Sequence, residues 1–222
     1  MRLRSVVLLT ALLLTACTPS SPRLMLPENC RADLTAQELV GRHWLQQPDI
    51  WRLRQAALLE IGPKKIPLEG FLRLDLNKQE ARLLAMNEMG VVLFDLLVTV
   101  QGETMQRAIP QLQQMPGLAE GVALSLRQIF LQPRPDTQDQ LEEHGNSQRL
   151  RRFLPGTKLG FTFDCDGVLR KTRLQGESGD WQVLYSQYRS FGETALPMEI
   201  ILNNYRQKVK LSLWIKEGRQ EE

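Results

Sequence analysis

Apolar and polar residues alternate with a period of two over most of the chain after Trp51, and this pattern predicts β-strands. Segments 51–61 and 66–76 flank the turn sequence Gly62-Pro63-Lys64-Lys65, which predicts a β-hairpin. Segment 208–216 alternates most clearly, with an apolar residue at every second position. Further strands are predicted over 82–86, 91–100, 103–109, 159–163, 168–174, 181–188 and 198–202.

Two segments follow a helical period instead. The first begins at the capping box Thr35-Ala36-Gln37-Glu38 and is expected to end at Pro48. The second, in the middle of the chain, ends before Pro133. Its apolar face consists of Leu118, Val122, Leu126 and Ile129. The polar segment 133–148 that follows is expected to be a loop.

These elements predict a mainly β fold of roughly ten to eleven antiparallel strands with some helix. Because strands twist, a sheet of this size curls, and helices on its concave side leave an apolar hollow. Such a hollow either packs shut as core or holds a ligand, and periodicity does not separate the two. The candidate cavity-lining residues are Leu72, Leu74, Leu76, Phe161, Phe163, Leu118, Val122, Leu126, Ile129, Val209, Leu211 and Leu213.

The N-terminus has the features of a secretory signal peptide. Arg2 and Arg4 precede the apolar run Val6–Leu14, which is too short to span a bilayer. The sequence Leu14-Thr15-Ala16-Cys17 resembles the lipobox of bacterial lipoproteins, in which the peptide is cut before the cysteine and the cysteine is acylated. An ordinary signal peptide with a chance cysteine is the alternative.

The expected organisation follows from this resemblance. Residues 1–16 are the signal peptide, residues 17–30 a lipidated flexible tether rich in Pro and Ser, and residues 31–222 one domain. In the lipoprotein family, Thr18 after the cysteine favours the outer membrane of a Gram-negative bacterium over the inner one. The protein is then anchored on the periplasmic face by acyl chains that contribute ~0.8 kcal/mol per buried CH₂ group.

The charge of the chain excludes one class of partner. The formal net charge of +3 falls near +1 once Arg2 and Arg4 are removed, and no block of like charge suits nucleic acid. Two further cysteines, Cys30 and Cys165, are expected either to form a disulfide in the oxidising periplasm or to be small buried residues.

No motif of the chain indicates catalysis, a metal or a cofactor. His43 and His144 lack metal-ligand spacing, and no nucleophile elbow or phosphate-binding glycine pattern occurs. The sequence Asp164-Cys165-Asp166-Gly167 is typical of a hairpin turn rather than a calcium loop. The basic cluster Arg149, Arg151 and Arg152 is interpreted as a solvated loop, or as a docking site for an acidic carrier or anionic lipid.

The C-terminal stretches Asp180-Trp181-Gln182-Val183-Leu184-Tyr185, Leu196-Pro197-Met198 and Lys208-Val209-Lys210-Leu211 resemble the LolB-like lipoproteins of the LolA/LolB superfamily. The turn Asn87-Glu88-Met89-Gly90 is similar to the Asn-Pro-Leu-Gly loop of that family, and Ser125–Ile129 to part of its central helix. An uncharacterised LolB-like group linked to aryl-polyene gene clusters is a closer candidate within the superfamily.

The resemblance implies a half-open β-barrel with a helical lid. Its apolar cavity accepts the acyl chains of lipoproteins from a LolA-like periplasmic carrier and releases them into the outer membrane. Met89 occupies the place of a leucine that protrudes toward the membrane, although Glu88 puts a charge beside it where the family has proline. The alternative for Met89 is an ordinary turn residue, or one tucked into the core.

The expected function is therefore an outer-membrane lipoprotein that binds the acyl chains of lipoproteins, or of another lipid-linked cargo, and passes them to the membrane. The alternative is a non-enzymatic structural or assembly lipoprotein that uses the same fold as a protein-docking module, with its hollow packed shut.

Overall fold

The computed structural model describes residues 26, 33–45, 50–191 and 194–221. The signal peptide and nearly all of the tether, including Cys17 and Cys30, lie outside the described residues. The strands are β1 Ile50–Ile61, β2 Lys64–Asp75, β3 Glu80–Met86, β4 Val92–Thr99, β5 Glu103–Ala108, β6 Gln140–His144, β7 Ser147–Leu154, β8 Thr157–Asp164, β9 Leu169–Gly176, β10 Gly179–Phe191, β11 Thr194–Asn204 and β12 Val209–Glu221. The helices are α1 Ala36–Gly41, α2 Pro110–Gln113 and α3 Leu118–Leu126, which continues as the π-helical turn η1 Arg127–Leu131.

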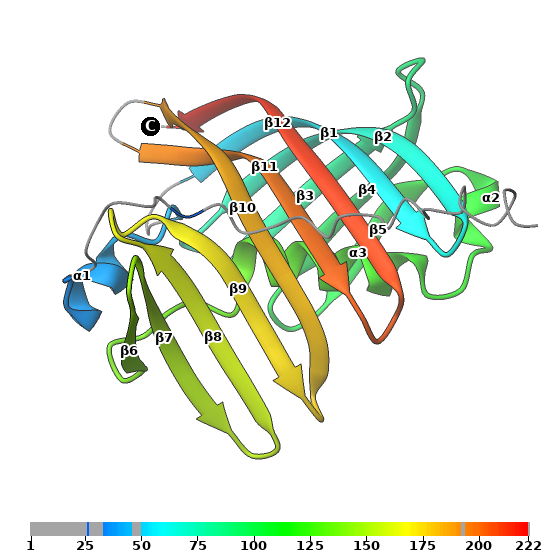
Figure 1. The fold of residues 1–222 in the computed structure, drawn as a ribbon. Coiled ribbons are helices and arrows are strands. Elements are labelled where there is room, and N and C mark those ends of the chain that lie inside the picture. The colour runs from blue at the N-terminus through cyan, green and yellow to red at the C-terminus, as the bar shows by residue number, and fades with distance from the viewer. Residues whose placement is uncertain (1–25, 27–32, 46–49, 192–193, 222) are drawn as a thin grey trace, which may run out of the picture.

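All twelve strands belong to one antiparallel sheet in the order β5-β4-β3-β2-β1-β12-β11-β10-β9-β8-β7-β6. Two meanders, β1–β5 and β6–β12, are joined where β1 pairs with β12. The sheet curls without closing, and α3 lies on its concave side (Figure 1). The predicted fold class is confirmed, with twelve strands in place of the ten to eleven expected.

One extra strand comes from segment 133–148, which was expected to be a loop, and that prediction is wrong; the other, β7, lies mostly after that segment, where no strand was predicted. Residues 140–144 form the edge strand β6, which pairs with β7. The basic cluster lies on β7 rather than in a solvated loop: Arg151 contacts Glu142 at 3.0 Å and Arg152 contacts Asp139 at 2.7 Å. The Arg151–Glu142 pair joins the two strands, whereas Asp139 lies just before β6. Charged residues at these positions take the place of the apolar alternation that marks the other strands.

The capping box at the first helix is confirmed. The Thr35 hydroxyl accepts a hydrogen bond from the Glu38 amide at 3.3 Å, and the Glu38 carboxylate accepts one from the Thr35 amide at 2.8 Å. The helix ends at Gly41, however, and does not continue toward Pro48 as predicted. The chain leaves the helix so that Trp44 enters the core, where its ring packs 6.0 Å from the ring of Phe130.

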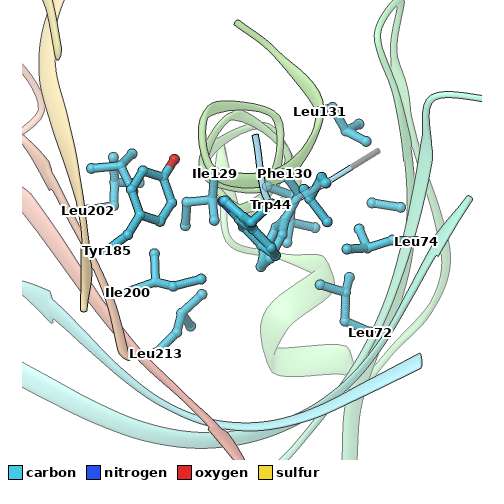
Figure 2. Packing of buried hydrophobic residues seen from close by; sticks show 14 of the residues in the cluster. Trp44, Leu72, Leu74, Ile129, Phe130, Leu131, Tyr185, Ile200, Leu202 and Leu213 are labelled. Atoms are coloured by element: carbon cyan, nitrogen blue, oxygen red, sulfur yellow. The ribbon is translucent and has the colours of Figure 1, made fainter. Parts of the chain in front are cut away.

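One half of the hollow is packed shut. Trp44, Phe130 and their neighbours on η1 meet side chains from both flanks of the curled sheet (Figure 2). Leu72 and Leu74 approach from β2, on one side. The opposite side is formed by Tyr185, Ile200, Leu202 and Leu213. This half of the hollow therefore has the dense packing of an ordinary protein core.

Candidate functional site: an apolar cavity beneath α3

The other half of the hollow contains a cavity of about 250 Å³ between α3 and the concave face of the sheet. Its walls come from β1, β2, β3, β4, β12, α3 and the turn before β12, and they are almost entirely apolar. The lining residues are Gln55, Ala57, Leu59, Ile61, Leu68, Glu69, Gly70, Leu83, Ala85, Phe94, Gly117, Leu118, Gly121, Val122, Ser125, Leu126, Gln207, Val209, Leu211 and Leu213.

Small residues create this space. Gly121 lies in the middle of α3, and a Cβ atom added to it would meet no atom within 4 Å. Glycine at an interior helix position costs roughly 0.5–1 kcal/mol relative to alanine. The sheet contributes Ala57 and Ala85 to the wall, whereas the space beside Gly70 is already filled by Leu83 and Gln55. The cavity therefore results from side chains too short to fill the gap between helix and sheet.

The cavity has a closed end and an open end. The inward-facing residues of β1 run from one end to the other. Gln55 is only 3% exposed and lies at the closed end, the floor, whereas Ile61 is 44% exposed and lies at the open end, the rim. Ile61 pairs with Val209, so the rim coincides with the ends of β1 and β12. At about 3.4 Å per residue, the floor lies ~20 Å from the rim along the strand.

The sequence-derived candidates divide between the cavity and the core. Those at the cavity wall are Leu118, Val122, Leu126, Val209, Leu211 and Leu213. Those in the packed core, each at most 4% exposed, are Leu72, Leu74, Leu76, Phe161, Phe163 and Ile129. The second set faces the half of the hollow that Trp44 and Phe130 fill, so these residues are core residues rather than cavity-lining ones.

Sequence reasoning missed part of the wall. The omitted residues include Gln55, Ala57, Gly70, Ala85 and Gly121. Their signal was present in the chain as small or polar residues at inward positions of apolar strands and of the central helix. Reading it requires knowledge of which inward positions face each other across the hollow.

The β3–β4 turn presents Met89 to solvent. The side chain is 84% exposed, so Met89 does not tuck into the core. The Asn87 side-chain oxygen accepts hydrogen bonds from the amides of Met89 at 3.0 Å and Val91 at 2.9 Å, which holds the turn in a defined shape. Gly90 takes the left-handed φ of +79° that closes it.

The β8–β9 turn is a hairpin turn, as predicted. Oδ1 of Asp164 accepts hydrogen bonds from the amides of Asp166 and Val168, and its Oδ2 binds Arg170 at 2.7 Å. These interactions already use the carboxylate oxygens that would have to bind a calcium ion. Cys165 in this turn is 8% exposed and disulfide-bonded. Because Cys30 lies outside the described residues, its pairing with Cys165 stays a prediction.

The His43 side chain is buried and hydrogen-bonded to the backbone. His43 is 8% exposed, and burial lowers its pKa to about 4. The Leu45 amide donates a hydrogen bond to Nδ1 of His43 at 3.2 Å. Among the residues that the structure describes, His, Cys, Asp and Glu form no group of three suited to a metal ion. In the same part of the chain, every helix is too short or too polar to cross a bilayer.

The fold and the site together define a class: a curled antiparallel sheet that holds an apolar cavity beneath one helix. No family model matches the chain, and no curated protein matches it significantly by sequence. Two solved structures do resemble it. The first is a LolA superfamily protein from Nitrosomonas europaea. The match spans 86% of this chain and 95% of that protein, at 11% identity and a TM-score of 0.54.

The second is a domain assigned to outer membrane lipoprotein sorting from Vibrio parahaemolyticus. The match spans 84% of this chain and 90% of that domain, at 10% identity and a TM-score of 0.55. The chain therefore has the LolA/LolB-like fold, as its sequence resemblance implied.

Proposed function

We propose that the protein is an outer-membrane-anchored lipoprotein that binds an acyl chain of a lipid-linked cargo in the cavity and passes it to the membrane. The observation that carries the proposal is the apolar cavity, which is closed at Gln55 and open at Ile61. The lipobox-like sequence ending at Cys17 supports the anchor. The two similar structures, a LolA superfamily protein and a domain assigned to lipoprotein sorting, support the class of cargo.

The size of the cavity suits transfer rather than storage. Its 250 Å³ is just below the range of pockets that enclose small ligands, about 300–1,000 Å³. A cavity of this size has room for one acyl chain at most, so the other chains of a multiply acylated cargo stay outside. Since each CH₂ group contributes ~0.8 kcal/mol when buried, a cargo that is only partly shielded gains free energy on entering a bilayer. Release to the membrane is then downhill.

The proposal is tested with the soluble chain from residue 17 carrying Cys17→Ala. Titration with an environment-sensitive fluorescent lipid is expected to show saturable binding that a tri-acylated peptide displaces. Gly121→Leu places a side chain in the cavity and is expected to weaken binding at least tenfold. Because leucine is the better helix former, the variant is expected to keep or raise the melting temperature.

Glu120→Leu is the matched control, since it adds a leucine at the adjacent, exposed position of α3. It is expected to bind the probe as the parent chain does. If folded parent protein shows no saturable binding, or if Gly121→Leu binds as tightly as Glu120→Leu, the cavity is not the acyl-chain site.

The approach to the membrane is proposed to use the rim. Strand register places the β1–β2, β3–β4, β7–β8 and β11–β12 turns at one end of the strands. Most of the exposed large apolar residues lie at this end, which is unusual for a surface that faces only water. They are Ile61, Ile66, Met89, Val91, Phe153, Leu154 and Tyr205.

Met89→Glu is expected to leave probe binding unchanged and to slow transfer of the bound chain to liposomes several-fold. The physical reason is the cost of bringing a carboxylate to the bilayer boundary. Stopped-flow transfer of the fluorescent lipid measures the rate. Leu141→Glu, which charges an exposed apolar residue on β6, is the control and is expected to transfer at the parental rate. Equal rates for both variants would exclude a membrane role of Met89.

A further inference from the structure

We infer that the rim of the cavity docks on a bilayer with anionic headgroups, through four cations that lie beside its exposed isoleucines. This inference rests on the proposed function and deepens it, because it names the chemistry of the membrane surface that receives the chain. The surface concerned is the rim patch, which consists of Ile61, Lys64, Lys65, Ile66, Arg206 and Lys208.

Two neighbouring turns form the rim patch. The end of the β1–β2 hairpin contributes Lys64 and Lys65, and the β11–β12 turn contributes the other two cations. Because Ile61 pairs with Lys64 on β2 and with Val209 on β12, the two turns lie side by side at the open end of the cavity (Figure 1). The four cations therefore lie together at the opening.

The charge of the rim patch exceeds that of the carboxylates beside it. Neither of the two turns contains an acidic residue. The carboxylate of Glu60 on β1 contacts Lys65 at 3.4 Å, but it also contacts Lys210 on β12 at 2.9 Å. One carboxylate is thus shared by two lysines, which leaves a net positive charge.

The other cations of the rim patch are not paired with carboxylates in the part of the chain that the structure describes. Lys64 and Lys208 are exposed and make no ion pair there. Arg206 donates a hydrogen bond to the backbone oxygen of Glu177 at 2.9 Å. The carboxylate of Glu177 itself lies beside Gly156, in the β7–β8 turn.

The opposite end of β1 and β2 shows a different arrangement. Arg52 and Arg73 both contact Glu221, and Arg54 contacts Glu217 at 3.0 Å. All three arginines of these two strands are therefore paired with carboxylates. The unbalanced positive charge belongs to the rim and is not a general property of this part of the sheet.

Exposed aliphatic side chains lie among the cations. Ile61 is 44% exposed and Ile66 is 38% exposed. Both lie on the cavity face of the sheet, since Ile61 lines the cavity and Ile66 pairs with Leu59, which also lines it. Isoleucines beside long basic side chains fit a bilayer boundary, where the apolar groups meet acyl chains and the ammonium groups reach headgroup phosphates.

The positive charge selects among bilayers. Each lysine or arginine near an anionic surface raises binding by about fivefold, and the attraction acts within a Debye length of ~10 Å at 0.1 M salt. A zwitterionic bilayer offers no such attraction. An acidic protein surface would match the charge, but the exposed isoleucines and the opening of an acyl-chain cavity favour a bilayer as the partner.

The test measures co-sedimentation of the soluble chain, from residue 17 with Cys17→Ala, with lipid vesicles. Binding to vesicles in which about a third of the lipid is phosphatidylglycerol is expected to be about tenfold tighter than binding to pure phosphatidylcholine vesicles, and to weaken as salt is raised. In the rim variant, which combines Lys64→Glu with Lys208→Glu, this preference is expected to be lost, while the fluorescent lipid still binds in the cavity.

The matched control combines Lys78→Glu with Lys216→Glu, which makes the same change of net charge at exposed lysines away from the rim. Lys78 lies in the β2–β3 turn at the other end of β2, and Lys216 lies ~24 Å from Val209 along β12. The control is expected to keep the parental preference for anionic vesicles within about twofold.

A second rim variant, Lys64→Gln with Lys208→Asn, is used if the first does not fold. It removes the charges without reversing them, and asparagine readily adopts the positive φ of +54° found at Lys208.

Equal binding of the parent chain to both kinds of vesicle would overturn the inference. An unchanged preference in the rim variant would also overturn it and would leave the rim cations to an acidic protein partner. In both cases the acyl-chain site stands as long as the fluorescent lipid binds. Absence of fluorescent-lipid binding to the parent chain contradicts the proposed function instead, whatever the vesicles show.

Discussion

Phe130→Ala is expected to lower the free energy of unfolding by about 3–5 kcal/mol, because it removes the ring that fills the packed half of the hollow. Phe130 is 2% exposed and packs edge-on against Trp44, with an angle of 71° between the ring planes. Trp44 in turn contacts the ring of Tyr185 at 6.0 Å. The space left by the ring is closed on all sides, so the structure can relax into it only in part. Urea denaturation of the soluble chain measures the change.

Phe71→Ala provides the comparison, since it makes the same substitution on a strand where the ring is 47% exposed. It is expected to cost about 1–2 kcal/mol, because about half of the ring is already in water. Equal losses for the two variants would contradict a hollow packed shut around Phe130.

Lowering the pH from 6.5 to 4 is expected to remove about 3 kcal/mol of stability through His43 alone. Burial lowers the pKa of His43 to about 4, against 6.5 for an exposed histidine. In the folded protein the ring is held neutral, whereas in the unfolded chain it takes up a proton below pH 6.5. The stability that the neutral ring contributes is therefore present above pH 6.5 and is lost as the pH falls toward 4, at about 1.4 kcal/mol per pH unit.

The contribution of His43 is isolated by comparison with His43→Gln, which cannot titrate. Unfolding free energies of both proteins are measured at several values between pH 4 and 7. Their difference is expected to shrink toward low pH, since the carboxylates titrate alike in both and cancel. Parallel curves would show that His43 is not protonated selectively in the unfolded chain.

Much of the fold could be predicted from the sequence because strands and caps are encoded locally. The alternation over 51–61 and 66–76 corresponds closely to β1 and β2, and the Thr35 capping box starts α1. The prediction failed at β6 and β7, where ion pairs replace the apolar alternation. It also failed at the end of α1, because the buried position of Trp44 decides where the helix stops.

The candidate site was predicted only in half for a related reason. Leu72 on β2 and Leu211 on β12 have the same inward alternation, yet one is core and the other cavity wall. The difference lies in what faces them. Phe130 and Trp44 occupy one half of the hollow, whereas Gly121 faces the other half with no side chain.

The sequence by itself determined the strand and hairpin pattern, the central helix and the resemblance to the LolA/LolB superfamily, because each is written in residues close together in the chain. Only the tertiary structure decided where the hollow stays open and which polar group lies at its floor. A cavity is the volume that Gln55, Ala57, Gly121 and Leu213 together fail to fill. These residues come from segments far apart in the chain, so no local sequence pattern predicts the volume between them.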